Sequence, residues 1–213
     1  ANRMSMILSL GQMHLHLGEP ERNFEQVRAW TEEAARRGSQ LVVFPELWPT
    51  AYDLEHWPRH ADQLGEGMFA RLSALAREQR LAVASSVLEA RAGRAYNTFA
   101  LYAADGSLQG LYRKVHLVPM LDEPRWLAAG DALTVAQTGW GPTGLGICYD
   151  LRFPGVTRWP ARGCFSCRPS GPAGASPTGR LSCAPGLSRT RSSWLPATGW
   201  GNPRARPSAG ARP

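Results

Sequence analysis

Three side chains with the chemistry for covalent catalysis each follow a short apolar run in this sequence. Glu46 comes after residues 41–44, Lys114 ends a strand-like segment, and Cys148 comes after 145–147. Because the ends of neighbouring strands meet at one edge of an α/β sheet, we expect the three groups to converge. A thiol, a carboxylate and an ammonium group at one edge could attack a carbonyl or nitrile carbon.

Each of the three groups has a distinct role in such a reaction. The thiolate of Cys148 is the attacking species, and a base or a positive charge must favour its ionisation. Glu46 can take the thiol proton, pass it to the departing amine and later activate water. Lys114 can stabilise the oxyanion of the tetrahedral intermediate, helped by a backbone N–H such as that of Tyr149.

Ordinary structural roles also fit these residues one at a time. A cysteine at the end of an apolar strand is often a small buried hydrophobic residue. Glu46 suits a turn or the first turn of a helix, and Lys114 suits a solvated strand end. The occurrence of all three in this order favours the catalytic interpretation.

The sequence resembles the nitrilase superfamily of carbon–nitrogen hydrolases across residues 4–154. The segments that carry this resemblance are 41–47 (LVVFPEL), 96–98 (YNT), 105–106 (DG), 112–117 (YRKVHL) and 146–154 (GICYDLRFP). The resemblance implies that Glu46 is the general base, Lys114 the oxyanion-stabilising lysine and Cys148 the nucleophile. Glu123 falls where many members carry a second glutamate that helps to position substrate and lysine, although a loop acid is an equally good interpretation.

The resemblance also implies a fold and a reaction. The family fold is a four-layer α-β-β-α sandwich, of which residues 1–154 would form somewhat more than half. The implied reaction is hydrolysis of a small amide to a carboxylate and ammonia through a cysteinyl thioester, with no cofactor and no metal. The motifs are most similar to the omega-amidase and deaminated-glutathione-amidase branch, whose substrates are amides of small dicarboxylic or keto acids. A homodimer is expected for the family.

Three further residues near these motifs are candidates for substrate binding. Arg152 could pair with a substrate carboxylate, since a guanidinium binds a carboxylate through two parallel hydrogen bonds. It could equally form a structural ion pair with Asp150. Trp48 and Tyr52 are candidates for lining the pocket, although aromatic side chains beside a strand are more often part of the core.

The alternation of apolar patterns predicts an α/β protein with helices covering the faces of a sheet. Helices are expected at 20–37 and 68–79. Strands are expected at 4–10, 41–44, 81–88, 98–103, 108–113, 133–137 and 145–148. The glycine-rich stretch 139–144 has the spacing of a dinucleotide-binding motif, but it leads into a strand and is better interpreted as a hairpin connection.

The net charge of +7 is concentrated in the last part of the chain. Residues 155–213 contain 9 Arg and no Asp, Glu, Lys or His. Residues 1–154 are therefore nearly neutral, with no nucleic-acid footprint. No apolar run approaches the roughly 20 residues of a membrane span, and the first residues lack a signal-peptide pattern, so a cytoplasmic location is expected.

Residues 155–213 differ in composition from the rest, with Gly, Pro, Ala and Arg making up 35 of the 59 positions. Such a segment buries little apolar surface, so we expect it to be disordered. Cys164, Cys167 and Cys183 lack a fourth ligand for zinc. One hypothesis is that the segment is an out-of-frame translation and the chain an inactive, poorly folded product. A weaker alternative is that it is a genuine basic, RNA-binding tail.

Overall fold

The computed structural model describes residues 6–153 and 163–167, which form two β-sheets with helices on one side. The first sheet has the strand order β1-β2-β3-β4-β5. Its strands are β1 (Leu8–Leu10), β2 (Leu41–Val43), β3 (Ala82–Arg91), β4 (Arg94–Tyr102) and β5 (Leu108–Arg113). The second sheet comprises β6 (Thr134–Thr138), β7 (Gly141–Ile147) and β8 (Gly163–Cys167).

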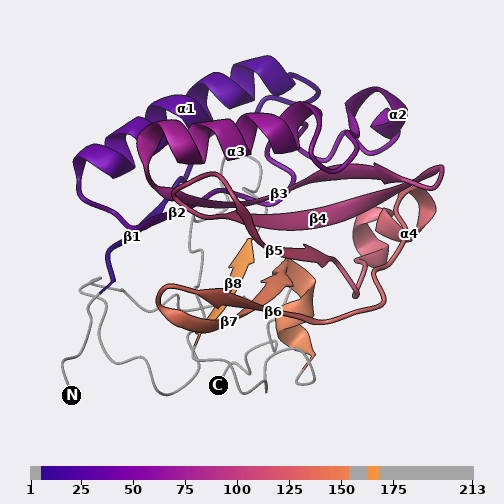
Figure 1. The fold of residues 1–213 in the computed structure, drawn as a ribbon. Helices are drawn as coiled ribbons and strands as arrows, with labels where there is room; N and C mark the ends of the chain where they lie inside the picture. The colour runs from indigo at the N-terminus through magenta and orange to yellow at the C-terminus, as the bar shows by residue number, and fades with distance from the viewer. Residues whose placement is uncertain (1–5, 154–162, 168–213) are drawn as a thin grey trace, which may run out of the picture.

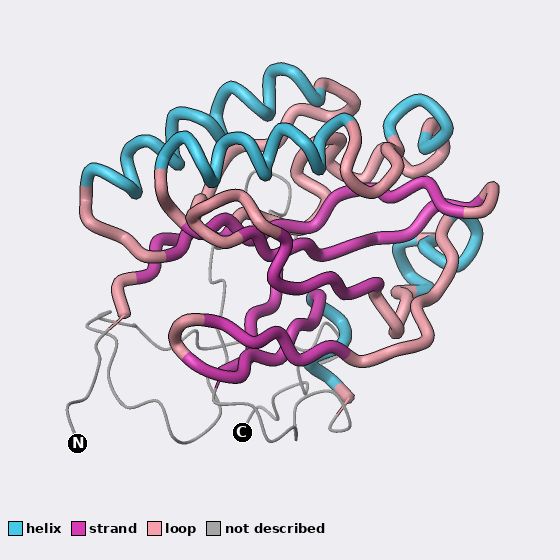
Figure 2. The backbone as a smooth tube through the Cα atoms, viewed as in Figure 1, coloured by secondary structure: helices cyan, strands magenta, loops and turns pink. Residues whose placement is uncertain are grey.

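Helices α1 (Pro20–Arg36) and α3 (Gly67–Gln79) lie side by side over one face of the first sheet, and the second sheet lies on its other face (Figure 1). The backbone tube shows the same order of helices, sheet and sheet (Figure 2). The short helical segments are α2 (Trp57–His60), η1 (Pro119–Leu121), α4 (Glu123–Trp126) and η2 (Cys148–Arg152). The described residues thus form an α-β-β arrangement, three of the four layers expected from the sequence.

Alternating side chains of the first sheet explain why it is covered on both faces. One set packs under the helices, and its strand members are Val42, Val83, Val87, Ala100 and Tyr102. The intervening set packs against the second sheet, and its strand members are Leu41, Val43, Ala82, Ala84, Phe99, Leu101 and Tyr112. Because successive side chains point to opposite faces, continuous apolar strands require a layer on each side. We call these two clusters the helix-side core and the inter-sheet core.

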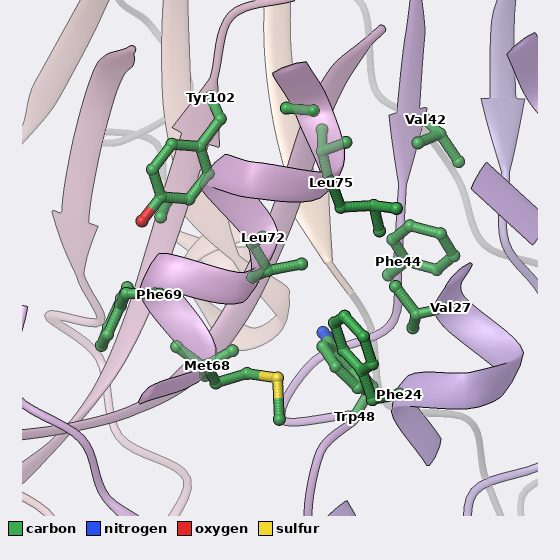
Figure 3. Close-up of a cluster of buried hydrophobic side chains, with 14 of the residues drawn as sticks. Phe24, Val27, Val42, Phe44, Trp48, Met68, Phe69, Leu72, Leu75 and Tyr102 are labelled. Carbon is green, nitrogen blue, oxygen red and sulfur yellow. The ribbon is translucent and has the colours of Figure 1, made fainter. Parts of the chain in front are cut away.

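Helix α1 follows the start and stop signals in its sequence. Pro20 occupies the first turn, where a missing N–H costs nothing, and Arg36 lies in the last turn, where a positive charge is favoured. Phe24, Val27 and Ala34 are buried at helical spacing and face the helix-side core. Figure 3 shows Phe24 and Val27 of this helix beside Trp48 and the side chains of α3.

Gly110 in β5 allows the two sheets to approach closely. A Cβ atom at this position would lie 2.8 Å from both the Cβ of Ala136 and the Cδ1 of Leu145, which belong to β6 and β7. Real Cβ atoms essentially never make contacts this short, so a larger residue would require the sheets to move apart.

Most of the expected elements are present within one to four residues of their predicted limits. The expected strand at 4–10 is described only as β1, and β3 and β4 are longer than expected because they continue to a tight turn at Ala92 and Gly93. Gly139 and Trp140 form the turn between β6 and β7, as the hairpin interpretation predicts. Within the described residues, no helix is long and apolar enough to cross a membrane.

The expectation that residues 155–213 lack regular structure is wrong for residues 163–167. These five residues form β8, which pairs in parallel with β7 from Thr143 to Ile147. Backbone pairing along β7 supplies hydrogen bonds that composition alone does not reveal. The remainder of the predicted disordered segment lies outside the described residues, as does Cys183.

Candidate active site

The strand ends bring Glu46 and Lys114 to the same edge of the first sheet. β2 pairs in parallel with β3, and β5 is antiparallel to β4, which is antiparallel to β3. The C-terminal ends of β2 and β5 therefore point in the same direction. Lys114 follows β5 directly, and its N–H donates to the carbonyl of Asn97 at the start of β4. Glu46 follows β2 after two residues.

Lys114 lies between two buried carboxylates. Its Nζ donates to Oε1 of Glu46 at 2.8 Å and to Oε1 of Glu123 at 2.7 Å. All three side chains are fully buried. A buried charge is tolerated only when it is paired and hydrogen-bonded, and one lysine between two carboxylates meets this condition for the ammonium group.

Glu46 has one occupied and one unoccupied carboxylate oxygen. Oε1 accepts from Lys114 and, at 2.7 Å, from the side-chain amide of Asn97. Oε2 is buried and has no hydrogen-bond partner among the described residues. Burial raises the pKa of Glu46, an effect that the positive charge of Lys114 opposes and the negative charge of Glu123 reinforces. A carboxylate with a raised pKa and a free oxygen is suited to general-base chemistry.

Glu123 is held by three donors. Besides Lys114, its Oε1 accepts from the Tyr52 hydroxyl at 3.2 Å, and its Oε2 accepts from the Val118 N–H at 2.7 Å. Burial, followed by the charges of Glu46, Glu123 and Cys148, raises the pKa of Tyr52 well above its usual value, so this hydroxyl stays protonated. These contacts place Glu123 against the lysine; that it helps to position the lysine stays a prediction.

The ammonium of Lys114 is kept charged by its neighbours. Burial alone would lower the pKa of Lys114, but the negative charges of Glu46 and Glu123 outweigh this effect and raise it. A permanently charged donor in a buried site can stabilise a developing oxyanion more strongly than the same donor in water.

Cys148 begins η2 immediately after β7, and its backbone has a positive φ of 43°. This left-handed conformation is unfavourable for a residue other than glycine, and such strain is concentrated at functional sites. The Cys148 side chain is half-buried and packs against the inter-sheet core.

The segments that carry Cys148 and Lys114 are tied together by Asp150. This buried carboxylate binds the backbone N–H of Ile147, just before the cysteine, and the backbone N–H of His116, two residues after the lysine. Neither Asp150 nor Asn97 was assigned a site role from the sequence. Their position within the motifs at 146–154 and 96–98 was the only signal that could have drawn attention to them.

The structure places Trp48 in the helix-side core, the second of the two locations considered for it. The side chain is fully buried, its ring lies beside Phe24 and Phe44, and its Nε1 donates to the Ser85 hydroxyl (Figure 3). Tyr52, by contrast, lies at the site through its bond to Glu123.

Arg152 is exposed, and the alternative that it forms an ion pair with Asp150 is not observed among the described residues. Its guanidinium lies 5.6 Å from the centre of the Tyr149 ring. Tyr149 is half-buried, with its ring edge toward Phe153. Both residues belong to η2, next to the cysteine.

Two surface hollows lie away from this cluster. One, of about 210 Å³, lies between the starts of α1 and α3, and a more open one borders the β3–β4 turn. Neither is lined by Glu46, Lys114 or Cys148.

Among the described residues, one group has donor atoms close enough for a metal ion: Asp53, Glu55 and His56. The Asp53 carboxylate there already contacts His56 at 2.7 Å and His60 at 2.9 Å, and Glu55 and His56 are exposed.

Solved structures with the same fold include enzymes of the nitrilase superfamily. Nit3 of Saccharomyces cerevisiae, a member of branch 10 of that superfamily, superposes with a TM-score of 0.69 at 26% identity, covering 76% of this chain and 64% of the yeast chain. An amidase from Nesterenkonia sp. AN1 superposes with a TM-score of 0.70 at 22% identity, which shows the fold alone.

Sequence relatives point to the same group of proteins. A hydrolase in the agr operon of Staphylococcus aureus is 38% identical over 162 residues, covering 74% of this chain and 61% of the relative. Omega-amidase NIT2 of Homo sapiens is 32% identical over 151 residues, covering 67% of this chain and 55% of the relative. The chain thus spans less than two thirds of the length of these relatives.

The match to the carbon-nitrogen hydrolase family covers residues 7–163 and therefore contains Glu46, Lys114, Glu123 and Cys148. It also continues past Pro154, where the resemblance was expected to end, and reaches the first residue of β8. With the sheet order, the buried lysine between two glutamates and the cysteine turn, this match shows that the chain belongs to the carbon-nitrogen hydrolase family.

Proposed function

We propose that this protein is an amidase that hydrolyses a small amide through a cysteinyl thioester. The observation that carries the proposal is the position of Lys114, fully buried between Glu46 and Glu123. Three buried charges are costly to desolvate even when they are paired, and their arrangement beside a cysteine turn matches the needs of acyl transfer.

In the first half of the reaction, Glu46 takes the proton of the Cys148 thiol and the thiolate attacks the amide carbon. The amide oxygen becomes an oxyanion, and Lys114 donates a hydrogen bond to it, with the Tyr149 N–H as second donor. Glu46 returns the proton to the amide nitrogen as the carbon–nitrogen bond breaks. Ammonia leaves, and the acyl group remains on sulfur as a thioester.

In the second half, Glu46 takes a proton from water, and the hydroxide formed attacks the thioester carbon. The same donors stabilise the second oxyanion, and the carbon–sulfur bond breaks. The thiolate leaves and regains a proton, so that one amide and one water give one carboxylic acid and one ammonia. Glu123 takes no proton in this scheme; its bond to Lys114 orients the ammonium group.

For the substrate, we propose an amide that carries a carboxylate at its other end. Arg152 is the cation nearest in sequence to Cys148, is exposed and forms no salt bridge among the described residues. A guanidinium is the preferred partner of a carboxylate because its N–H groups match the two oxygens. The similarity to omega-amidase NIT2 supports the same substrate class.

The test compares two amides of nearly the same shape. Succinamate carries a terminal carboxylate where butyramide carries a methyl group. We expect ammonia release from both, with a higher kcat/KM for succinamate, and we expect Arg152→Ala to remove most of the difference. If the wild-type chain releases no ammonia from either amide, or if Cys148→Ser releases it equally fast, the proposed reaction is wrong. An unchanged preference in Arg152→Ala would overturn the substrate assignment alone.

A further inference from the structure

The carboxylate of Asp150 accepts from four donors on three residues, which belong to two separate parts of the chain. Oδ1 accepts from the backbone N–H of His116 at 3.0 Å and from its Nδ1 at 2.8 Å. Oδ2 accepts from the Tyr112 hydroxyl at 2.8 Å and from the Ile147 N–H at 3.0 Å. Since a carboxylate oxygen can only accept, the His116 ring is assigned its proton on Nδ1.

These donors flank the two reacting groups of the proposed mechanism. Tyr112 and His116 lie two residues before and two residues after Lys114, and Ile147 immediately precedes Cys148. Two residues of extended chain span at most about 7 Å, so each contact constrains the backbone of a catalytic residue directly. The Tyr112 hydroxyl also accepts from the Val115 N–H at 3.2 Å, which closes the turn around Lys114.

The cysteine turn needs such an external constraint. Cys148 has a positive φ, which an isolated chain would leave for a more favourable backbone conformation. Phe153 directly follows η2, and its ring stacks on His116 with ring centres 3.6 Å apart. Asp150 is fully buried, so its four bonds are shielded from water and are stronger than bonds at the surface.

We propose that Asp150 is a positioning residue that holds the Cys148 turn against the strand end carrying Lys114. His116 is its partner on the Lys114 side. The role of Asp150 in turnover rests on the proposed function. The effect of Asp150 on the reactivity of the Cys148 thiol does not.

Asparagine at position 150 is the sharpest single substitution, because it has the same size but one donor group. In one orientation its NH₂ faces the Ile147 N–H; in the other it faces both N–H groups of His116. Either orientation leaves at least one buried donor unpaired, which makes the turn less favourable. Asp105→Asn, the same chemical change in the exposed β4–β5 turn, is the matched control.

The first readout is alkylation of Cys148 by iodoacetamide in the 213-residue chain, followed by mass spectrometry of the tryptic peptide that ends at Arg152. We expect Asp150→Asn to slow alkylation near neutral pH by roughly 10-fold to 10²-fold, the range that misplacement of a reacting group produces. We also expect its pH dependence to move toward that of a free thiol. Asp105→Asn should match the wild type in rate and pH dependence.

His116 provides a second pair of variants in case Asp150→Asn does not fold, because this side chain is partly exposed. His116→Ala removes the ring donor to Asp150 Oδ1 but keeps the backbone donor, and it should slow alkylation. His116→Asn keeps an N–H close to the position of Nδ1 and should restore much of the rate. Equal rates for the wild type and both His116 variants would overturn the proposal.

The outcomes separate this inference from the proposed function. If Asp150→Asn lowers the denaturation midpoint but alkylates at the wild-type rate while folded, Asp150 is only structural and the proposal is wrong. If the wild type shows no amide hydrolysis but Asp150→Asn still changes thiol reactivity, the proposed function fails and the positioning role stands. If amide hydrolysis is found, kcat should fall in Asp150→Asn with little change in KM, and an unchanged kcat would overturn the role in turnover.

Discussion

The Tyr52 hydroxyl donates to Oε1 of Glu123 at 3.2 Å, although the two residues are 71 positions apart in the chain. Glu123 Oε1 also accepts from Lys114 at 2.7 Å, so the phenol and the ammonium share one oxygen. Tyr52 has a positive φ of 70°, a backbone conformation that is unfavourable for a residue other than glycine.

We predict that Tyr52→Phe leaves the Glu46–Lys114 pair intact but loosens Glu123. A single hydrogen bond to a charged group contributes about 1.5–3 kcal/mol, and a bond of 3.2 Å belongs at the lower end of that range. The free energy of unfolding, measured by urea denaturation, should fall by about 1–2 kcal/mol. No change in this free energy would indicate that the hydroxyl is dispensable to Glu123.

Cys148 is predicted to be the only cysteine needed for amide hydrolysis. Cys148→Ser should abolish ammonia release, since a serine hydroxyl is a far weaker nucleophile than a thiolate when the base is a carboxylate. The control is a variant in which Cys164, Cys167 and Cys183 are all replaced by serine, and it should retain the wild-type rate. Turnover by Cys148→Ser with an unmodified serine would contradict the thioester mechanism.

The pH dependence of the reaction should report Glu46. The base must be ionised, so kcat/KM should rise as pH increases through the pKa of Glu46, which burial holds above its usual value of 4.5. Glu46→Gln should slow the reaction by about 10²-fold to 10⁴-fold and abolish this acidic limb. An acidic limb that persists unchanged in the glutamine variant would assign the titration to another group.

Lys114→Met should destabilise the protein because two buried carboxylates lose their shared cation. Removing one partner of a buried ion pair typically costs about 3–5 kcal/mol. The raised pKa of Lys114 means that its stabilising charge is fully present below the usual lysine value of 10.5 and is lost only as pH rises through the higher folded value.

In the Met variant the carboxylates should take up protons more readily, so the stability difference from wild type should be smaller at pH 5 than at pH 8. Urea denaturation at these two pH values measures it. A difference that does not depend on pH would mean that the carboxylates are not the source of the destabilisation. Replacing Arg113, one residue earlier, provides a comparison for the pH dependence. Arg113 pairs with Glu89 at 2.6 Å, and this pair is not part of the cluster around Lys114.

Trp48 should prove to be a core residue. Trp48→Ala removes a fully buried ring, for which a loss of about 3–5 kcal/mol in unfolding free energy is typical. Trp30→Ala, at a position on α1 that is 44% exposed, should cost far less. If Trp48→Ala changed KM for the amide without lowering stability, Trp48 would belong to the substrate pocket after all.

The sequence pattern drew attention to the parts of the candidate site that follow apolar strands. Glu46 and Lys114 could be singled out because Lys114 directly follows, and Glu46 follows within three residues, a run that reads as a buried strand, and the cysteine motif is distinctive. Asn97 and Asp150 could not be found in this way, because their partners are distant in sequence. Asp150 meets His116 only after both sheets have packed.

The limits of the pattern-based fold prediction have similar causes. The outer parts of β3 and β4, around Glu89 and Tyr96, carry polar side chains that mask their strand character, although Glu89 is buried and accepts from Thr98 at 2.6 Å. The bend at Cys148 is absent from the apolar pattern, which predicts a continuous strand to that residue. β8 depends on pairing with β7 more than on its own composition.

Gly110 makes the geometry of the candidate site depend on packing between the two sheets, far from any reacting atom. Cys148, the proposed nucleophile, follows a strand of one sheet, and Lys114, the proposed oxyanion donor, follows a strand of the other, so the gap between the sheets sets the distance between the thiol and the ammonium. A single methyl group at Gly110 would meet both Ala136 and Leu145 at 2.8 Å and act as a wedge between the two halves of the site. The absence of a side chain in the middle of β5 therefore keeps the two sheets, and with them the Cys148 thiol and the Lys114 ammonium, at their observed separation.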